Sequence, residues 1–265
     1  MIANYHTHTP RCGHARGSER EYIEQAIAHG FSELGFSDHA PMPFPKSVPE
    51  DNLCHLLSMR VQMEQTEEYV NTLLDLRREY KNDIDIHIGF ETEHFDCCFD
   101  EFIEYISQYP IDYLILGQHF SDPMSDSMMY VGNRKNSPEL LSSYVDTAIK
   151  AISSGKITYV AHPDLPAVCH DLALYQSEMT RLIECANSHH VPLEINFLGL
   201  RELRNYPSIQ FWQLAAGIGC DVIFGSDAHR PEDVYDPVTH ALAKSIVDSN
   251  PGLHLLDRAV LRPIV

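Results

Sequence analysis

The sequence lacks the features that mark membrane-spanning and exported proteins. No run approaches the roughly 18 apolar residues that a membrane-spanning helix needs. The first residues, MIANYHTH, contain no basic segment followed by an apolar stretch, as an export signal would. C-x-x-C pairs are also absent, and the seven cysteines are an odd number. We therefore expect reduced thiols, no disulfide framework, no membrane partner and a cytoplasmic location.

Basic residues are scarce as well. Nineteen lysines and arginines stand against 38 aspartates and glutamates, which gives a formal net charge of −19. A surface this acidic repels the phosphate backbone of nucleic acids. The composition therefore argues against a nucleic-acid partner, but the charge alone assigns no function.

What the sequence does contain is a regular alternation of short apolar runs and longer amphipathic stretches. The apolar runs predict strands at 2–5, 33–37, 84–90, 112–117, 157–161, 192–197 and 221–225. The amphipathic stretches predict helices at 19–29, 52–80, 99–108, 138–153, 172–189, 207–217 and 233–248. Seven strand–helix units in strict alternation favour a parallel sheet closed into an α/β barrel, with residues 1–265 as a single domain. A doubly wound open sheet is the alternative.

Residues suited to binding metal ions follow six of the seven predicted strands. His6 and His8 come after the first strand, two positions apart, so both imidazoles point to one face of an extended chain. Later strands end in GFSDH, GFE, LGQH, VAHPD and FGSDAH, and these motifs supply His39, Glu91, His119, His162, Asp227 and His229. The carboxyl ends of parallel barrel strands share one rim, where barrel active sites are built. The sequence therefore predicts a metal site at this rim, with imidazole and carboxylate ligands that suit zinc, iron or manganese.

Other residues near these motifs are weaker candidates. Glu93 would share a face with Glu91, but Glu91 follows the third strand directly. Cys12 lies between ligand candidates, although the ligand count does not require a thiolate. His170 is a candidate late in the rim. The histidines outside the motifs are expected to be ordinary structural or surface residues: His29, His55, His87, His94, His170, His189, His190, His240 and His254.

The motif set YHTHT, CGH, GFSDHAP, GFE, LGQHF, AHPD and GSDAH resembles the PHP (polymerase and histidinol phosphatase) superfamily. The N-terminal segment HTHTPRCGHARGSEREYIEQAIAHGFSELGFSDHAP is similar to its histidinol-phosphatase branch in particular. The resemblance extends from His6 to at least His229. It implies a distorted (β/α)7 barrel with the metal site at the C-terminal rim, in agreement with the seven strand–helix units.

The resemblance also implies a site for three divalent ions, which would be zinc, iron or manganese. Carried over motif by motif, it assigns His6, His8, Glu91 and Asp227 to the first ion, His14, His39 and His229 to the second, and Glu91, as a bridge, with His119 and His162 to the third. Every one of these positions carries a suitable ligand in this sequence.

Such a cluster suits the hydrolysis of phosphate monoesters. Divalent ions lower the pKa of bound water from about 15.7 towards neutrality and neutralise charge on the phosphoryl group and the departing alkoxide. The hypothesis is direct in-line attack by a metal-bridging hydroxide, with Glu91, Asp227 and His229 as catalytic residues and no phosphoenzyme. Several cations in the pocket would also allow a protein of net charge −19 to bind a phosphate dianion.

Two arginines are candidates for binding the phosphate, because a guanidinium can bind two phosphate oxygens at once. Arg16 follows His14, and Arg201 follows the sixth strand in EINFLGLR, a segment that also resembles the histidinol-phosphatase branch. Either arginine could instead form a surface salt bridge. The long polar loop at 121–137 could be a lid over the site or an ordinary surface loop.

The branch resemblance implies a histidinol-phosphatase, which converts L-histidinol phosphate and water to L-histidinol and phosphate in histidine biosynthesis. A PHP phosphoesterase that acts on another small phosphate ester is the first alternative. A metal-dependent amidohydrolase is the second, because H-x-H after the first barrel strand also occurs in those sites; however, no lysine is placed here for the carboxylated lysine they usually keep. A non-enzymatic metal-binding protein is the third, and the complete ligand set disfavours it.

Overall fold

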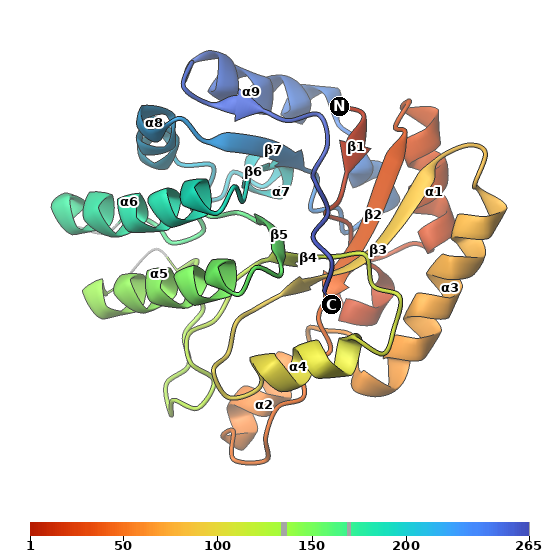
Figure 1. Ribbon diagram of the computed structural model, residues 1–265, viewed down its shortest axis with the longest axis horizontal. Coiled ribbons are helices and arrows are strands. Elements are labelled where there is room, and N and C mark those ends of the chain that lie inside the picture. Colours follow the sequence, from red (N-terminus) through yellow and green to blue (C-terminus); the bar gives the residue numbers. More distant parts are fainter. Residues whose placement is uncertain (134–136, 169–170, 265) are drawn as a thin grey trace.

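The computed structural model describes residues 1–133, 137–168 and 171–264 and has an α/β fold (Figure 1). One sheet of eight parallel strands runs in the order β1 to β8, each strand pairing with the next. The strands are β1 (Ala3–Asn4), β2 (Glu33–His39), β3 (Asp85–Thr92), β4 (Tyr113–Leu116), β5 (Ile157–Val160), β6 (Leu193–Asn196), β7 (Asp221–Gly225) and β8 (His254–Leu255). The predicted parallel α/β fold with seven strands is confirmed; β8, with only two residues, was too short to predict.

The sheet curls so that β1 and β7 meet at their carboxyl ends. Thr7 and Ala228, which follow these strands, form an isolated parallel bridge. The backbone N–H of His8 donates to the carbonyl of Ala228 at 3.0 Å, and that of Ala228 donates to the carbonyl of His6 at 3.3 Å. The amino-terminal end of β7 pairs with β8 instead. The barrel is therefore distorted, and it closes at the rim where the predicted ligands gather.

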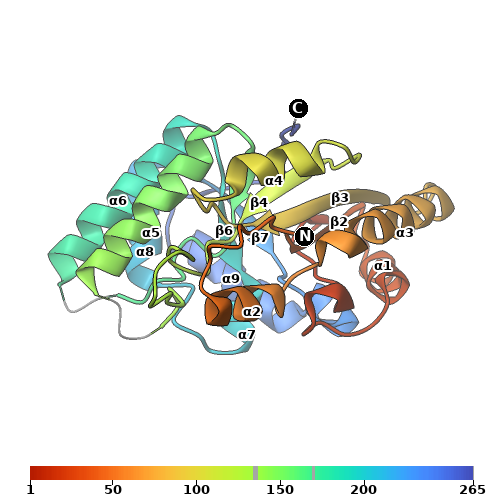
Figure 2. The ribbon, with the colours of Figure 1, turned by 90° about the horizontal axis from the view of Figure 1, so that it is seen from below.

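Helices surround the outside of the curled sheet, and α5 and α6 lie side by side (Figures 1 and 2). The α-helices are α1 (Glu19–Ala28), α2 (Glu50–Leu57), α3 (Thr66–Glu79), α4 (Phe99–Ile106), α5 (Pro138–Ser153), α6 (Leu172–Ser188), α7 (Phe197–Arg201), α8 (Ile209–Ile218) and α9 (Pro237–Asp248). Short 3₁₀ turns are η1 (Pro10–Cys12), η2 (Met63–Gln65) and η3 (Pro231–Val234). None of the described helices is long and apolar enough to cross a membrane.

The helix predicted over 52–80 is wrong as a single element, because the chain leaves the helical path between α2 and α3. The buried Arg60 turns inward, donating to the carbonyl of Leu56 at 2.7 Å and pairing with Glu93 at 2.9 Å. The backbone N–H of Val61 donates to the carbonyl of His39 at 3.1 Å. These contacts fix the segment against the rim, and a continuous helix could not make them.

The short helix α7 was also not predicted. The predicted strand at 192–197 ends at Asn196, whose side chain accepts a hydrogen bond from the backbone N–H of Gly199 at 3.1 Å and so caps the new helix. This cap turns the chain sharply at the rim and brings Arg201 back towards β7, where it contacts the carbonyl of Ser226.

The barrel interior is packed and does not form a channel. An inner cluster of buried side chains fills it, distinct from the larger core between sheet and helices: Ala3, Tyr5, Tyr113, Ile115, Tyr159, Ala161 and Ile223. Ala259 and Leu261 of the C-terminal segment pack against this cluster. Because the interior is filled, a site for a small molecule has to lie at the rim.

Candidate metal centre

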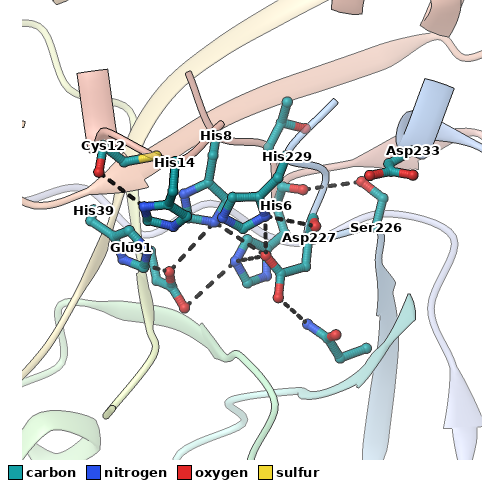
Figure 3. Close-up of polar contacts among 12 residues, drawn as sticks. His6, His8, Cys12, His14, His39, Glu91, Ser226, Asp227, His229 and Asp233 are labelled. Carbon is teal, nitrogen blue, oxygen red and sulfur yellow. Dashed lines mark hydrogen bonds and ion pairs between the residues drawn. The ribbon is translucent and has the colours of Figure 1, made fainter. Parts of the chain in front are cut away.

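All nine predicted ligands lie in one cluster at the carboxyl ends of the strands; seven of them, with Cys12, are labelled close together in Figure 3. His39 and Glu91 end neighbouring strands and are paired in register. The others follow the remaining strands: His6 and His8 after β1, His14 after η1, His119 after β4, His162 after β5, and Asp227 and His229 after β7.

Glu91 is at the centre of this cluster and is 2% exposed. One carboxylate oxygen, Oε2, lies 3.0 Å from His39 Nδ1, and the other, Oε1, lies 2.8 Å from His162 Nε2. Nitrogen atoms of three more histidines lie 3.5–3.7 Å from its oxygens: His6, His8 and His119. A Cβ at position 117 would overlap this carboxylate, so Gly117 of the LGQH motif makes room for it. One carboxylate therefore faces five imidazoles, as a bridging ligand would.

Asp227 holds the opposite side of the cluster. Its Oδ1 lies 3.2 Å from His8 Nε2 and 3.5 Å from His6 Nε2. Asp227 and His162 both adopt positive φ, +46° and +31°, which is uncommon for residues other than glycine. Such backbone strain is tolerated where the surrounding structure imposes it, and it collects at functional sites. Here it turns two side chains inward at the ends of their strands.

Several polar atoms in the cluster are buried without a hydrogen-bond partner among the described residues. They include His6 Nε2, His8 Nε2 and Glu91 Oε2. An unsatisfied buried polar atom costs about 1–3 kcal/mol, so a protein does not keep several together without a ligand for them. A divalent cation would satisfy all three, because His6, His8 and Glu91 offer ligand atoms that lie within 4.8 Å of one another.

The ligand atoms also fall into groups whose members lie within 4.8 Å of one another. One group matches the ligands predicted for the second ion, and a second group holds three of the four predicted for the first. A third group contains two ligands predicted for the third ion, Glu91 and His119, but its other member is His39. The remaining ligand predicted for that ion, His162, lies in a group with His6 and Asp227. The groups are His14–His39–His229, His6–His8–Glu91, His39–Glu91–His119, His6–His162–Asp227 and His8–Cys12–His229. The arrangement thus suits divalent metal ions.

Burial and charge act in opposite directions in this cluster. Burial disfavours a charged His6, but Glu194, Asp227 and Glu91 outweigh it and raise the pKa of His6 to about 10. Burial would raise the pKa of Glu91, but the surrounding histidines hold it well below its usual range. Burial lowers the pKa of His39 to about 4. The carboxylates therefore stay charged, and a divalent ion would take over the neutralising role of the proton on His6 and release that proton.

Buried carboxylates behind the ligands were missed in the sequence. Asp38 precedes His39, and its Oδ1 lies 3.4 Å from His8 Nδ1 while its Oδ2 accepts from the backbone N–H of Thr9 at 3.1 Å. Glu194 contacts His6 Nδ1 at 2.8 Å. Metal-binding histidines usually donate their second N–H to such a carboxylate, which fixes the ring tautomer. In the sequence, these two carboxylates could have been noticed only as the acidic residues of the motifs SDH and EIN.

The weaker sequence candidates lie at the edge of the cluster. Glu93 is buried and pairs with Arg60, while its Oε1 accepts from the backbone N–H of His119 at 3.0 Å. It therefore holds the His119 segment in place and does not face the other ligands. Cys12 is buried close to His8 and His229. His170 lies outside the described residues.

A cavity of about 520 Å³ opens over the cluster. Five arginines line it, and three of them already have partners: Arg60 contacts Glu93, Arg204 contacts Glu202, and Arg201 donates to the carbonyls of Ser226 and Asp227 at 2.9 and 3.2 Å. The side chains of Arg16 and Arg230 are exposed and make no hydrogen bond or ion pair with the described residues. The cavity thus combines metal-binding side chains with positive charge in an otherwise acidic protein.

A second chamber of about 710 Å³ adjoins the first. The two share a wall of mostly aromatic and charged side chains: Met59, Phe120, Tyr130, Glu202, Arg204 and Tyr206. Phe120 and Tyr130 bridge the base of the loop predicted as a lid or surface loop at 121–137, of which 134–136 lie outside the described residues. The base of this loop is therefore part of the cavity wall.

The chain is similar in sequence and in fold to known proteins. Over 239 residues the chain is 28% identical to a probable histidinol-phosphatase of Deinococcus radiodurans, covering 88% of each chain. Over 259 residues it is 26% identical to the histidinol-phosphatase of Bacillus subtilis, covering 86% of this chain and 94% of the relative. The crystal structure of histidinol phosphate phosphatase from Lactococcus lactis, complexed with zinc, L-histidinol and phosphate, superimposes with a TM-score of 0.72 at 19% identity, covering 96% and 95% of the two chains.

The family comparison gives the same result over most of the chain. A model of the PHP domain matches residues 4–197, which include strands β2 to β6, the last residue of β1 and seven of the nine predicted ligands. The resemblance seen in the sequence motifs is therefore confirmed, and the chain belongs to the PHP domain family.

Proposed function

We propose that this chain is a metal-dependent phosphomonoesterase that hydrolyses L-histidinol phosphate to L-histidinol and phosphate, a step of histidine biosynthesis. The observation that carries the proposal is the convergence of seven imidazoles and two carboxylates, with unsatisfied buried atoms, beneath a cavity lined by arginines. The names of the relatives from Deinococcus radiodurans and Bacillus subtilis support the substrate. So do the ligands of the Lactococcus lactis enzyme, which shares the fold.

The proposed centre holds three divalent ions of zinc, iron or manganese. Such ions supply a low-pKa water and neutralise charge on the phosphoryl oxygens when bound. Glu91 is placed to hold ions together because it contacts imidazoles on both sides. Asp227 and His229 complete the opposite wall, and with Glu91 they are the proposed catalytic residues. His14, His39 and His229 form a group that would hold one ion at the cavity mouth.

The arginines of the cavity would interact with the phosphate in different ways. Arg16 lines the cavity, its guanidinium has no partner among the described residues, and it is the proposed phosphate contact; Arg230 is placed in the same way. Arg201, the second predicted contact, donates to two backbone carbonyls and approaches Asp233 at 3.6 Å. It brings positive charge to the phosphate while holding the segment that carries Asp227.

Two carboxylates in the cavity would suit the leaving group of histidinol phosphate, which carries an amine and an imidazole. Glu202 and Asp233 both line the cavity on the side away from Glu91's strand. Each is paired with an arginine, so their charge is held in position. A cationic leaving group and an anionic phosphate would therefore meet opposite charges in the same cavity.

We also propose that residues 1–265 form one catalytic domain. Asp227 and His229 lie beyond the stretch matched by the family model, yet both contact His8, which follows β1, and Asp227 also contacts His6. The six described cysteines are all free, which supports the proposed cytoplasmic location. The net charge of −19 supports the absence of a nucleic-acid partner.

The second chamber favours one alternative, a PHP phosphoesterase for a larger phosphate ester. The cavity over the metal cluster is already of a size typical for small ligands, so the adjoining 710 Å³ could receive a bulkier leaving group. An amidohydrolase is less well supported, because no lysine occurs among the described residues that line either chamber.

Metal analysis combined with a panel of phosphate monoesters tests the proposal. The wild type should bind about three metal ions per chain, the number that the family resemblance implies, and should hydrolyse L-histidinol phosphate with the highest kcat/KM of the panel. His8→Ala should lose metal and activity together. Fewer than two bound ions with undiminished hydrolysis would refute the metal mechanism. A higher kcat/KM for a bulkier ester would favour the alternative substrate.

A further inference from the structure

Glu194 is a fully buried carboxylate on β6, the one predicted strand that supplies no metal ligand. Its ion-pair partner is His6, and no arginine or lysine among the described residues neutralises it. A buried carboxylate without such a cation is costly unless hydrogen bonds or a metal compensate it. Its partners therefore indicate why it is there.

The two oxygens of Glu194 contact three different groups of the metal cluster. Oε1 accepts from His6 Nδ1 at 2.8 Å. Oε2 accepts from the backbone N–H of His162 at 2.9 Å and from Asn196 Nδ2 at 2.8 Å. The same Nδ2 of Asn196 lies 3.1 Å from Asp227 Oδ2. One side chain thus reaches His6 and His162 directly and Asp227 through a single amide.

The contact with His6 decides which ring nitrogen is available. In the neutral ring that a metal ion needs, donation of Nδ1–H to Glu194 leaves the lone pair on Nε2, which is buried, has no hydrogen-bond partner among the described residues and lies 3.5 Å from both Glu91 Oε1 and Asp227 Oδ1. The contact with His162 restrains a residue whose φ is +31°, where an unrestrained backbone would relax. Both effects place ligand atoms before any ion binds.

The neighbouring strand is shaped to admit Glu194. A Cβ at position 225 would overlap its carboxylate, and glycine is present there, at the end of β7. The same relation holds between Gly117 and Glu91. Two buried carboxylates at the rim are therefore each accommodated by a glycine at the end of the adjacent strand. One of them, Glu91, is a predicted ligand, and the other, Glu194, lies behind the predicted ligands.

We propose that Glu194 is a positioning residue of the metal centre: it fixes the tautomer of His6, anchors His162 and, through Asn196, orients Asp227. The inference rests on the proposed metal centre but not on the identity of the substrate. Removing such a carboxylate behind a metal ligand typically lowers metal affinity about 10–100-fold. Loss of Glu194 should accordingly weaken metal binding while the metal-free chain remains folded.

Glu194→Gln tests the proposal, with Glu33→Gln as the matched control. Glu33 is a largely buried carboxylate at the opposite end of the barrel, where it contacts Tyr5 and Arg258. Affinity is measured for Zn²⁺ and Mn²⁺ alone by competition with a chelator, and the fold of the metal-free proteins is followed by circular dichroism. Glu194→Gln should lose at least tenfold in affinity, and Glu33→Gln should stay within twofold of the wild type.

Equal losses in both variants, or wild-type affinity in folded Glu194→Gln, would overturn the proposal. If Glu194→Gln is insoluble, Glu194→Asp replaces it, because its shortened side chain cannot reach His6 and His162 together; wild-type affinity there would be equally contrary. Failure of the substrate assignment would appear differently, as normal metal binding in the wild type without hydrolysis of L-histidinol phosphate.

Discussion

The two ends of the barrel neutralise their buried carboxylates with different partners. At the amino-terminal end, Glu33 pairs with Arg258 and accepts from the hydroxyl of Tyr5, and the C-terminal segment covers the inner cluster. At the carboxyl rim, the ion-pair partners of Glu91 and Asp227 among the described residues are all histidines. One end neutralises its carboxylate with an arginine, whereas the other uses histidine protons, which external cations can replace. The amino-terminal end therefore suits stability, and the carboxyl rim suits the binding of cations.

The largest expected effect is at the centre of the rim. Glu91→Gln keeps the shape of the side chain but removes the charge that faces five imidazoles. Activity should fall by more than about 100-fold, the upper range for changes behind the ligands, and bound metal should fall with it. Steady-state phosphate release and elemental analysis measure both. Glu178→Gln on α6 is the control, since Glu178 pairs with Arg181 on the surface; retained metal in Glu91→Gln would contradict the bridging role.

Metal removal should weaken the rim and leave the other end intact. A ligand present at 1,000 times its Kd stabilises the folded state by about 4 kcal/mol per site. At about 2–4 °C per kcal/mol for a chain of this size, chelation should lower Tm by about 10 °C for each site that is emptied, and added metal should restore it. Thermal unfolding with and without chelator measures the shift. An unchanged Tm would show that the rim carboxylates are neutralised without metal.

Part of the fold and of the rim site could be predicted from the sequence, and part could not. The H-x-H, GFE and GSDAH motifs predicted residues that lie together in the structure, because each motif follows an apolar run and parallel strands bring their ends to one rim. Arg60 and Glu194 were not found, because their importance depends on partners far away in sequence, Glu93 and His6. The short β8 and α7 were not predicted either, since elements of two and five residues show too little hydrophobic periodicity to detect.

A smaller effect is expected at the cavity mouth. Arg16→Ala should lower kcat/KM for a phosphate monoester at least about 10-fold, since a hydrogen bond to a charged group contributes about 1.5–3 kcal/mol, and metal content should stay unchanged. Arg20→Ala serves as control because Arg20 pairs with Glu79 on the exposed surface. An unchanged kcat/KM in Arg16→Ala would assign the phosphate contact to another arginine, and Arg230→Ala would then be the next variant.

The smallest effect is expected inside the barrel. Tyr159 is fully buried, and its hydroxyl has no hydrogen-bond partner among the described residues. Tyr159→Phe should therefore leave stability equal or slightly higher, whereas Tyr113→Phe should lose about 1 kcal/mol, because the Tyr113 hydroxyl donates to the carbonyl of Tyr5 at 2.7 Å. Denaturant unfolding compares the two variants. Equal destabilisation by both would mean that the interior hydroxyls act as one network.

Hydrolysis of L-histidinol phosphate by the purified chain, before and after removal of metal, tests the central claim most directly. The account predicts phosphate release that disappears on chelation, returns with zinc, iron or manganese, and exceeds that from other monoesters. Release that persists in a protein shown to contain no metal, or absence of release from the fully metal-loaded protein, would contradict it.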